Sequence, residues 1–467
     1  MRILLINSPY QFRDKTIHRT ELLGLEYLAG ALRRDGFQVF IYDPTLCDAI
    51  QLDSGLYYYG EDAHNIIGKI REIGPDYVGI SCHYSFASKE AYKIAKMCKE
   101  INDKIVVIMG GVFVSVFQER PIKECSAIDY CLIGESEKSF SKLLTELPKP
   151  GVDLAKIDGL IYRKNGIIIK NLKCDFIEDL NSLSFPARDL VDIKSYMRGS
   201  EVKKLYGLGA KPALSILTSR ACPYRCSFCN MWMSHGSKWR SRSPDNIISE
   251  IDEITNKYSA GHVFIMDDNF TYSIDRAKSI CSKILEKGIR FRWNTPNGIS
   301  VKKIDQELAD LMKRSGCANV CVAIESGSEY LRNVVMNKKV SNNEISEAVN
   351  CFNKADIPVV GYIMLGIPGE DNEHFMETVR FLKKIRLTAV VVSFAVPFPG
   401  TQLCLDLIGK GIIESGDKID EIQDFNTPIY STIDFTKDDL IERKKIIKDM
   451  FPSLAVLEKL EEKYCIL

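Results

Sequence analysis

The sequence predicts two α/β domains in series, a doubly wound parallel sheet followed by a partial (β/α)6 barrel, and then a helical tail. Two observations predict this class. Short Val/Ile/Leu-rich runs alternate with amphipathic helices over residues 1–147, and the same alternation returns over 212–401. Between them, residues 148–211 open with Pro148 and Gly151 and lose the pattern, as expected of a linker.

Five strands are expected in the first series, each a compact apolar run. They are Arg2–Asn7, Gln38–Asp43, Tyr77–His83, Ile105–Gly111 and Tyr130–Glu135. Runs without polar alternation are typical of parallel strands that are buried on both faces. After the first strand, Leu22, Leu25, Leu28 and Leu32 recur at helical spacing. Five β-α units of this length predict a doubly wound sheet.

The linker should contain a small hairpin that turns at Asn165–Gly166. Six strands are expected in the second series, and Ser341 before Glu344 is a helix-start signal of the expected kind. The strands are Ala213–Thr218, His262–Asp267, Arg290–Asn294, Asn319–Glu325, Val359–Leu365 and Ala389–Val396. Six units suit an open, partial barrel better than a closed one of eight.

Residues 402–467 form a charged tail in which Leu454, Leu457 and Leu460 recur at helical spacing. We expect this tail to be a helical cap, and it carries no recognisable chemical motif.

Composition narrows the function classes. Lys and Arg total 62 and Asp and Glu total 62, so the formal net charge is zero and a nucleic-acid partner is not expected. No apolar run is long enough to span a membrane, and the N-terminus lacks the features of a signal peptide. Fifteen cysteines without such a peptide indicate a reducing compartment, so we expect a cytoplasmic protein.

The strongest chemical motif follows the first strand of the second series, where Cys222, Cys226 and Cys229 have C-x3-C-x2-C spacing. Three thiolates in one loop can bind three irons of a 4Fe–4S cubane and leave the fourth open to a small molecule. A structural zinc site with His235 is an alternative, and so are three merely packed thiols. The position at the carboxyl end of a barrel strand favours the cluster.

This motif, with the aromatic Phe228 before its last cysteine and six β-α units around it, resembles the radical S-adenosylmethionine (SAM) superfamily. The resemblance implies that the three cysteines hold a 4Fe–4S cluster and that SAM chelates the open iron, with Phe228 beside it. An electron from the cluster would then cleave SAM to a 5′-deoxyadenosyl radical.

The resemblance also implies SAM-binding residues at the ends of three strands. Asp267 and Asp268 end the second strand, where the superfamily commonly has a Gly-Gly-Glu that is absent here; a solvated turn or a helix N-cap is the alternative. Glu325 and Ser326 end the fourth strand and would contact the ribose or the amino acid part. Gly366 ends the fifth strand, beside the adenine.

A doubly wound domain ahead of such a barrel resembles the cobalamin-dependent branch of the superfamily, whose N-terminal domain is flavodoxin-like. The D-x-H-x-x-G motif, which supplies a lower cobalt ligand in other cobalamin modules, is absent; His18 or His83 could substitute. The strand-end glycines could instead be plain turns, since some relatives keep this fold without cobalamin. The implied cobalamin-binding residues are Ser8, Ser81, Gly110, Gly111, Gly134 and Glu135.

The resemblance implies methylation of an unactivated carbon, with SAM as radical source and cobalamin as methyl carrier. A non-methylating rearrangement or cyclisation is the alternative within enzymes, and a non-catalytic sensor of cluster or cobalamin is the alternative of another class. The expected electron donor is a flavodoxin or ferredoxin. Small molecules, lipids and peptides all remain open as substrates.

Overall fold

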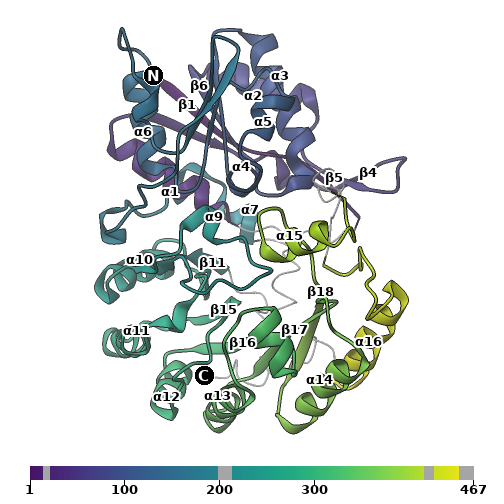
Figure 1. Cartoon of the computed structure of the whole chain (residues 1–467). Helices are drawn as coiled ribbons and strands as arrows, with labels where there is room; N and C mark the ends of the chain where they lie inside the picture. Colours follow the sequence, from purple (N-terminus) through teal and green to yellow (C-terminus); the bar gives the residue numbers. More distant parts are fainter. Residues whose placement is uncertain (14–20, 198–212, 415–424, 452–467) are drawn as a thin grey trace. The chain divides into compact units, whose positions relative to one another are not determined.

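The computed structural model describes residues 1–13, 21–197, 213–414 and 425–451. These residues divide into two compact units, each with its own sheet (Figure 1). The first unit contains the described residues up to 197 and also the segment 230–236, whereas the second contains the other described residues.

The first unit is built on a seven-stranded sheet in the order β10-β9-β8-β7-β6-β1-β3. Its strands are β1 (Arg2–Asn7), β3 (Gln38–Tyr42), β6 (Tyr77–Ser81), β7 (Val106–Gly110), β8 (Tyr130–Leu132), β9 (Leu160–Lys164) and β10 (Ile167–Lys170). The five strands from β3 to β8 are parallel, and their chain order across the sheet is 2-1-3-4-5. This is the flavodoxin-like order, so the predicted fold class of this domain is confirmed.

Helices cover both faces of this sheet. They are α1 (Leu23–Arg34), α2 (Ala63–Ile73), α3 (Ser88–Ile101), α4 (Val112–Phe117), α5 (Arg120–Glu124) and α6 (Glu137–Glu146). Successive side chains of a strand point to opposite faces. In β1, Ile3 and Leu5 therefore pack with α1 and α6, while Leu4 and Ile6 pack with α2 and α3. All four are fully buried, which explains the unbroken apolar run of β1.

The hairpin that was predicted within a linker is part of the first unit. β9 pairs antiparallel with β8, and β10 pairs antiparallel with β9. Asn165 and Gly166 both have positive φ, as the predicted two-residue turn requires. Without β9, the apolar strand β8 would be an exposed edge, and Leu160 and Ile161 would lose their burial in the two cores. The first unit thus extends beyond residue 147.

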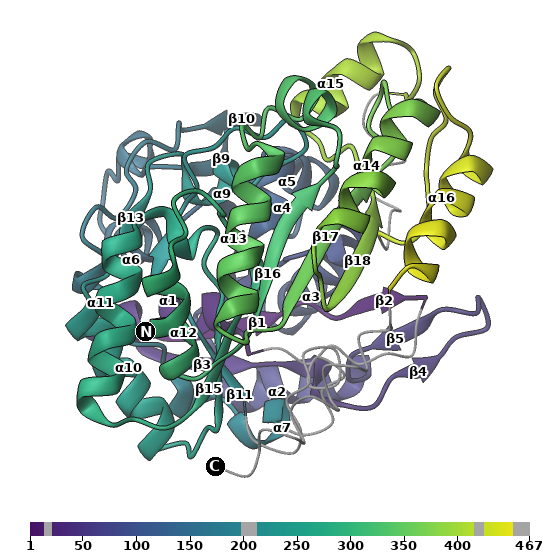
Figure 2. The ribbon, with the colours of Figure 1, turned by 90° about the horizontal axis from the view of Figure 1, so that it is seen from below.

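A small antiparallel sheet, unexpected from the sequence, accompanies this unit and is seen from another side in Figure 2. Its strands are β2 (Tyr10–Phe12), β4 (Ile50–Gln51) and β5 (Tyr57–Tyr59), and Tyr10 stacks on Tyr59 with 4.8 Å between ring centroids. Two short helices, α7 (Ile193–Met197) and α9 (Trp232–His235), also belong to the first unit.

The second unit has six parallel strands in the order β11-β14-β15-β16-β17-β18, which is also their order along the chain. They are β11 (Ala213–Ile216), β14 (His262–Ile265), β15 (Arg292–Ile299), β16 (Cys317–Glu325), β17 (Val359–Leu365) and β18 (Ala389–Phe394). The helices stand in a row outside the strands (Figure 1) and are α10 (Pro244–Asn256), α11 (Ile274–Lys287), α12 (Gln306–Arg314), α13 (Asn342–Lys354) and α14 (Asn372–Lys384). The predicted partial (β/α)6 barrel is confirmed.

Side-chain caps decide where these helices begin. The Ser243 hydroxyl accepts from the Asn246 backbone N–H ahead of α10. The Ser341 hydroxyl and the Glu344 carboxylate form a reciprocal capping box ahead of α13, as the sequence signal indicated. Such caps satisfy backbone donors that have no partner within the helix.

The described part of the tail contains two helices, α15 (Gln402–Gly409) and α16 (Lys437–Asp449), as the predicted helical tail requires. α16 lies alongside β18 and buries Leu440 and Ile447 (Figure 2). It thereby covers the edge strand of the barrel sheet. Leu454, Leu457 and Leu460 lie outside the described residues. None of the described helices is both long and apolar enough to cross a membrane.

Candidate active site

The three motif cysteines lie in one loop at the carboxyl end of the barrel. β12 (Ser219–Arg220) and β13 (Arg240–Ser241) pair with each other and bracket this loop. Cys222, Cys226 and Cys229 are all half-buried, and the Cys229 N–H donates to the Cys226 carbonyl at 3.1 Å. Three thiols without disulfides, grouped in one loop, have the donor chemistry of a 4Fe–4S site.

Three consecutive polar residues after β14 hold the start of this loop. The Asp267 carboxylate accepts from the Thr218 backbone N–H at 2.6 Å and from the Ser219 hydroxyl at 2.6 Å. The Asp268 carboxylate accepts from the Ala221 N–H at 3.1 Å. β14 neighbours β11 in the sheet, so the residues that follow both strands meet at the same edge.

Asp267 anchors the start of the cysteine loop. It is buried, and both of its oxygens accept hydrogen bonds from Thr218 and Ser219. Burial raises the pKa of this carboxyl, while the Arg276 guanidinium and these donors oppose the rise. The SAM-binding roles of Asp267 and Asp268 stay predictions, but the contacts seen here hold the cysteine loop.

Asn269, the next residue, was missed by the sequence reasoning. Its Nδ2 lies 3.8 Å from the Cys222 sulfur. Its Oδ1 is buried and has no hydrogen-bond partner among the described residues. A buried acceptor without a partner costs free energy unless a ligand fills the position. Asn269 can therefore accept from an amino group beside Cys222, which fits SAM at this site. Its only sequence signal is its place after two aspartates at a strand end.

The opposite side of the cysteine loop is held by two further segments. The Ser227 N–H donates to the Met336 carbonyl at 2.9 Å, and the Asn337 side chain donates to the Arg225 carbonyl at 2.9 Å. The Leu403 N–H, at the start of α15, donates to the Ser227 carbonyl at 2.9 Å. The tail, for which the sequence suggested no chemistry, thus contributes to the cluster loop. Phe228 lies half-buried within that loop.

Glu325 has the strained backbone typical of functional sites. It ends β16 with φ +63°, a conformation that side-chain-bearing residues rarely adopt, next to a register shift against β17. Its Oε1 lies 2.9 Å from the Lys338 Nζ, and the two side chains are only 10% and 17% exposed. Glu325 remains a candidate SAM ligand, and Lys338 is a second residue that the sequence reasoning missed.

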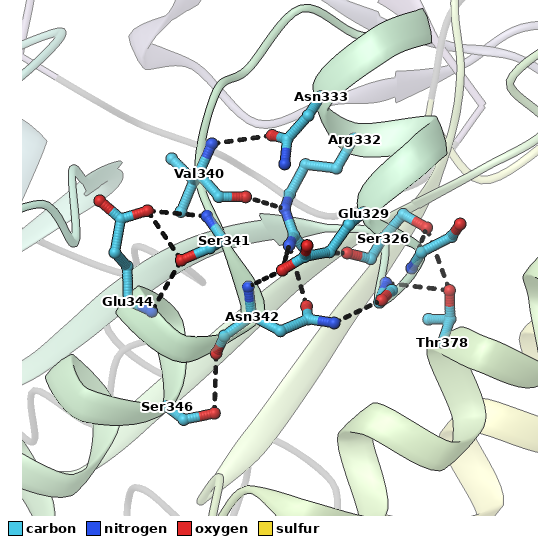
Figure 3. A network of polar contacts seen from close by, with 12 residues as sticks. Ser326, Glu329, Arg332, Asn333, Val340, Ser341, Asn342, Glu344, Ser346 and Thr378 are labelled. Carbon is cyan, nitrogen blue, oxygen red and sulfur yellow. Dashed lines mark hydrogen bonds and ion pairs between the residues drawn. The ribbon is translucent and has the colours of Figure 1, made fainter.

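Ser326 is engaged within a polar network (Figure 3). Its hydroxyl lies 3.1 Å from the Thr378 hydroxyl and accepts from the Ser328 N–H at 3.1 Å. Its carbonyl accepts from the Arg332 guanidinium at 2.5 Å. These bonds indicate that Ser326 shapes the turn after β16, and direct contact with SAM stays a prediction.

The backbone of Gly366 has a conformation that favours glycine. Its φ is +87°, and a Cβ here would lie 2.9 Å from the Leu440 Cδ1 of α16. Its N–H donates to the Glu370 Oε2 at 2.5 Å, and its carbonyl accepts from the Tyr430 hydroxyl at 2.5 Å. The predicted place beside the adenine is untested, whereas the contacts of Gly366 are with the C-terminal cap.

Replacing Glu370 with Gln should remove a pH dependence of stability. Burial raises the pKa of Glu370 from its ordinary 4.5 to about 7, so the folded state binds a proton that the unfolded state releases. The native protein therefore loses up to about 3 kcal/mol as pH rises from 4.5 to 7, relative to Glu370→Gln. Urea unfolding at pH 5 and pH 8 measures this difference. The exposed Glu373→Gln is the control, and equal pH dependence in all three proteins would contradict the prediction.

In the first unit, the predicted cobalamin residues lie at the carboxyl ends of neighbouring parallel strands. Ser81 pairs with Gly110 across β6 and β7 and is half-buried. Gly111 has φ +100°, and a Cβ there would lie 2.5 Å from the Cys82 carbonyl oxygen. Strand order reverses between β1 and β6, where doubly wound folds bind ligands. This edge fits a ligand tail that enters between the strands.

The other predicted cobalamin residues are engaged with the surrounding loops. The Ser8 hydroxyl donates to the Ala87 carbonyl at 3.0 Å, and the Glu135 carboxylate accepts from the Ile177 N–H at 3.0 Å. The Gly134 N–H donates to the Ser115 hydroxyl at 2.9 Å. These contacts tie the strand ends to adjacent loops, so a direct ligand role for Ser8, Gly134 and Glu135 stays a prediction.

Two of the histidines considered as metal ligands, His83 and His235, belong to the first unit. His235 belongs to the first unit, whereas the three cysteines belong to the second. His83 is exposed after β6, with its ring against Tyr84, and His18 lies outside the described residues. Within the described ranges, no three His, Cys, Asp or Glu side chains surround one point as a single ion requires. In a cubane, by contrast, each cysteine binds its own iron.

Comparison with known proteins agrees with this division of the chain. The family model for the radical SAM superfamily matches residues 216–382, and that for the B12 binding domain matches residues 18–144. An uncharacterised methyltransferase of Pyrococcus horikoshii is 30% identical over 86% of this chain and 82% of its own length.

More distant relatives carry more specific names. The cytidylyl-2-hydroxyethylphosphonate methyltransferase of Streptomyces wedmorensis is 24% identical over 90% of this chain and 84% of its own. The anaerobic magnesium-protoporphyrin IX monomethyl ester cyclase of Rubrivivax gelatinosus is 23% identical over 95% and 76%.

Among solved structures, the radical SAM methyltransferase TsrM from Kitasatospora setae superposes with a TM-score of 0.69 and 20% identity, over 88% of this chain and 76% of that chain. This likeness supports the fold. Together with the cysteine loop, the two matched domains and the 30% identical relative establish the family. The chain belongs to the cobalamin-dependent radical SAM enzymes, whose cofactors are a 4Fe–4S cluster, SAM and cobalamin.

Proposed function

We propose that this enzyme transfers a methyl group to an unactivated carbon of its substrate. When bound, the cluster supplies the electron that cleaves SAM to a 5′-deoxyadenosyl radical, and cobalamin supplies the methyl group. The observation that carries the proposal is the match to a methyltransferase relative across 86% of the chain, through both domains.

The residues around the cluster loop support this assignment. In the proposal, Cys222, Cys226 and Cys229 hold the cluster while the side chains after β14 fix the loop. Asn269 Oδ1 and Glu325 are acceptors for the SAM amino group and ribose. Both are buried, which excludes water from the place where a radical would form.

In the first unit, the proposal assigns the cobalamin tail to the edge formed by Ser81, Gly110 and Gly111. The half-buried Ser81 hydroxyl can bind a polar group of the tail. Gly110 leaves open space above the strand end, because a Cβ there would only touch the Leu132 carbonyl at 3.8 Å. The first unit then carries cobalamin, and the second carries SAM.

A second candidate function is a non-methylating cyclisation or rearrangement. It is favoured by the cyclase relative, which aligns over 95% of this chain. Both functions use the same three cofactors, so the residues of the site do not separate them.

The balanced charge of the chain, 62 positive and 62 negative residues, supports a small molecule, lipid or peptide substrate over a nucleic acid. Radical SAM chemistry requires an electron donor. We propose a flavodoxin or a ferredoxin for this role.

Product analysis tests the proposal. The protein is purified without oxygen from cells supplied with hydroxocobalamin, its iron and cobalt are measured, and it is then reduced in the presence of SAM. Methyl transfer predicts about four irons and one cobalt per chain and formation of both S-adenosylhomocysteine and 5′-deoxyadenosine. 5′-Deoxyadenosine alone would favour the second candidate. If the protein binds both cofactors but forms neither product, a non-catalytic sensor is the remaining interpretation.

A further inference from the structure

Lys338 is a half-buried cation in the segment that is hydrogen-bonded to the cluster loop. Its side chain is 17% exposed, and its Nζ is 2.9 Å from the Glu325 Oε1. Burying an ammonium group is costly unless nearby negative charge compensates it. Glu325 supplies one such charge, and the three thiolates of a bound cluster would supply more.

The backbone around Lys338 is held in an unusual conformation. Asn337 and Lys339, on either side, have φ values of +55° and +58°, which side-chain-bearing residues seldom adopt. The preceding residues are hydrogen-bonded to the cysteine loop, Met336 to Ser227 and Asn337 to Arg225. The strained backbone and these hydrogen bonds together hold Lys338 at one position against this loop.

A buried arginine keeps the whole segment in place (Figure 3). The Arg332 guanidinium donates to the Ser326 carbonyl at 2.5 Å, to the Val340 carbonyl at 2.7 Å and to the Asn342 Oδ1 at 2.9 Å. Arg332 itself is fully buried. It therefore joins the end of β16, which carries Glu325, to the segment that carries Lys338.

The segment that carries Lys338 lies against the residues that flank Cys226. The Ser227 N–H bonds to the Met336 carbonyl, and the Arg225 carbonyl accepts from the Asn337 side chain. A cation held in this segment can stabilise negative charge on a cluster bound by the loop.

We propose that Lys338 is a positioning residue that serves as a fixed counter-charge to the cluster and raises its reduction potential. Reduction adds one electron to an already anionic cluster with three thiolates, and a nearby cation stabilises that added charge. Glu325 partly offsets the effect. The proposal rests on the 4Fe–4S assignment, but not on methyl transfer.

The test is a redox titration of the reconstituted protein, followed by electron paramagnetic resonance without SAM or substrate. Lys338→Met should lower the ratio of reduced to oxidised cluster at a given potential by tenfold or more, which is about 59 mV for one electron. The exposed neighbour Lys339→Met removes the same charge and should leave the potential unchanged. Lys338→Arg keeps the charge and should keep the potential.

Glu325→Gln should shift the reduction potential in the opposite direction. Removing this carboxylate should raise the potential, whereas a loop that is merely loosened would not respond oppositely to the two substitutions. If Lys338→Met fails to retain iron, Lys338→Arg and Glu325→Gln still decide the question. A potential unchanged or lowered in Glu325→Gln, or equal shifts in Lys338→Met and Lys339→Met, would overturn the proposal. Because no product is measured, failure here is distinct from failure of the proposed methyl transfer.

Discussion

Alanine at Cys222, Cys226 or Cys229 is expected to abolish cluster loading and SAM cleavage. Each thiolate binds a different iron, so no remaining ligand can replace the lost one. The loop is also held at separate points by Asp268 and Asn337, which leaves little freedom for another residue to move in. Iron content and 5′-deoxyadenosine formation after anaerobic reconstitution measure the effect, and both should fall to background.

Cys174→Ala is the matched control, because this thiol is exposed and belongs to the first unit. It should leave both measurements unchanged. Retained SAM cleavage in any one of the three motif variants would refute the cluster assignment.

Replacing Arg332 with Met is expected to destabilise the second unit by about 3 to 5 kcal/mol. The substitution keeps an apolar stem of similar length but leaves the Ser326 and Val340 carbonyls and the Asn342 Oδ1 without their donor. Each buried acceptor left unpaired costs about 1 to 3 kcal/mol. Urea unfolding, monitored through the buried Trp293, measures the loss.

The same substitution should reduce iron loading, because the segment held by Arg332 bonds to the cysteine loop through Met336 and Asn337. The exposed Arg314→Met also removes one arginine from the second unit and should change stability by less than about 0.5 kcal/mol. If the free energy of unfolding of Arg332→Met lies within 1 kcal/mol of that of the parent protein, Arg332 does not stabilise this network as predicted.

The sequence by itself determined the features that depend on local pattern. Apolar runs alternating with helical periodicity predicted both sheets, since a strand buried on both faces can contain few polar residues. The C-x3-C-x2-C spacing predicted the cluster loop because its ligands lie within eight residues of one another. The capping box before α13 is equally local and was found where it was expected.

Only the tertiary structure decided what depends on distant residues. The hairpin β9–β10 was predicted, but its pairing with β8 could not be. The apolar pattern of a strand does not specify which other strand it pairs with. The hydrogen bonds of Asp267 with Thr218 and Ser219, nearly fifty residues earlier in the chain, could not be predicted from the sequence either. The segment of Lys338 meets the cysteine loop through hydrogen bonds of Met336 and Asn337, more than a hundred residues away along the chain. Local periodicity determines which residues form an element, whereas folding determines which polar groups meet at its end.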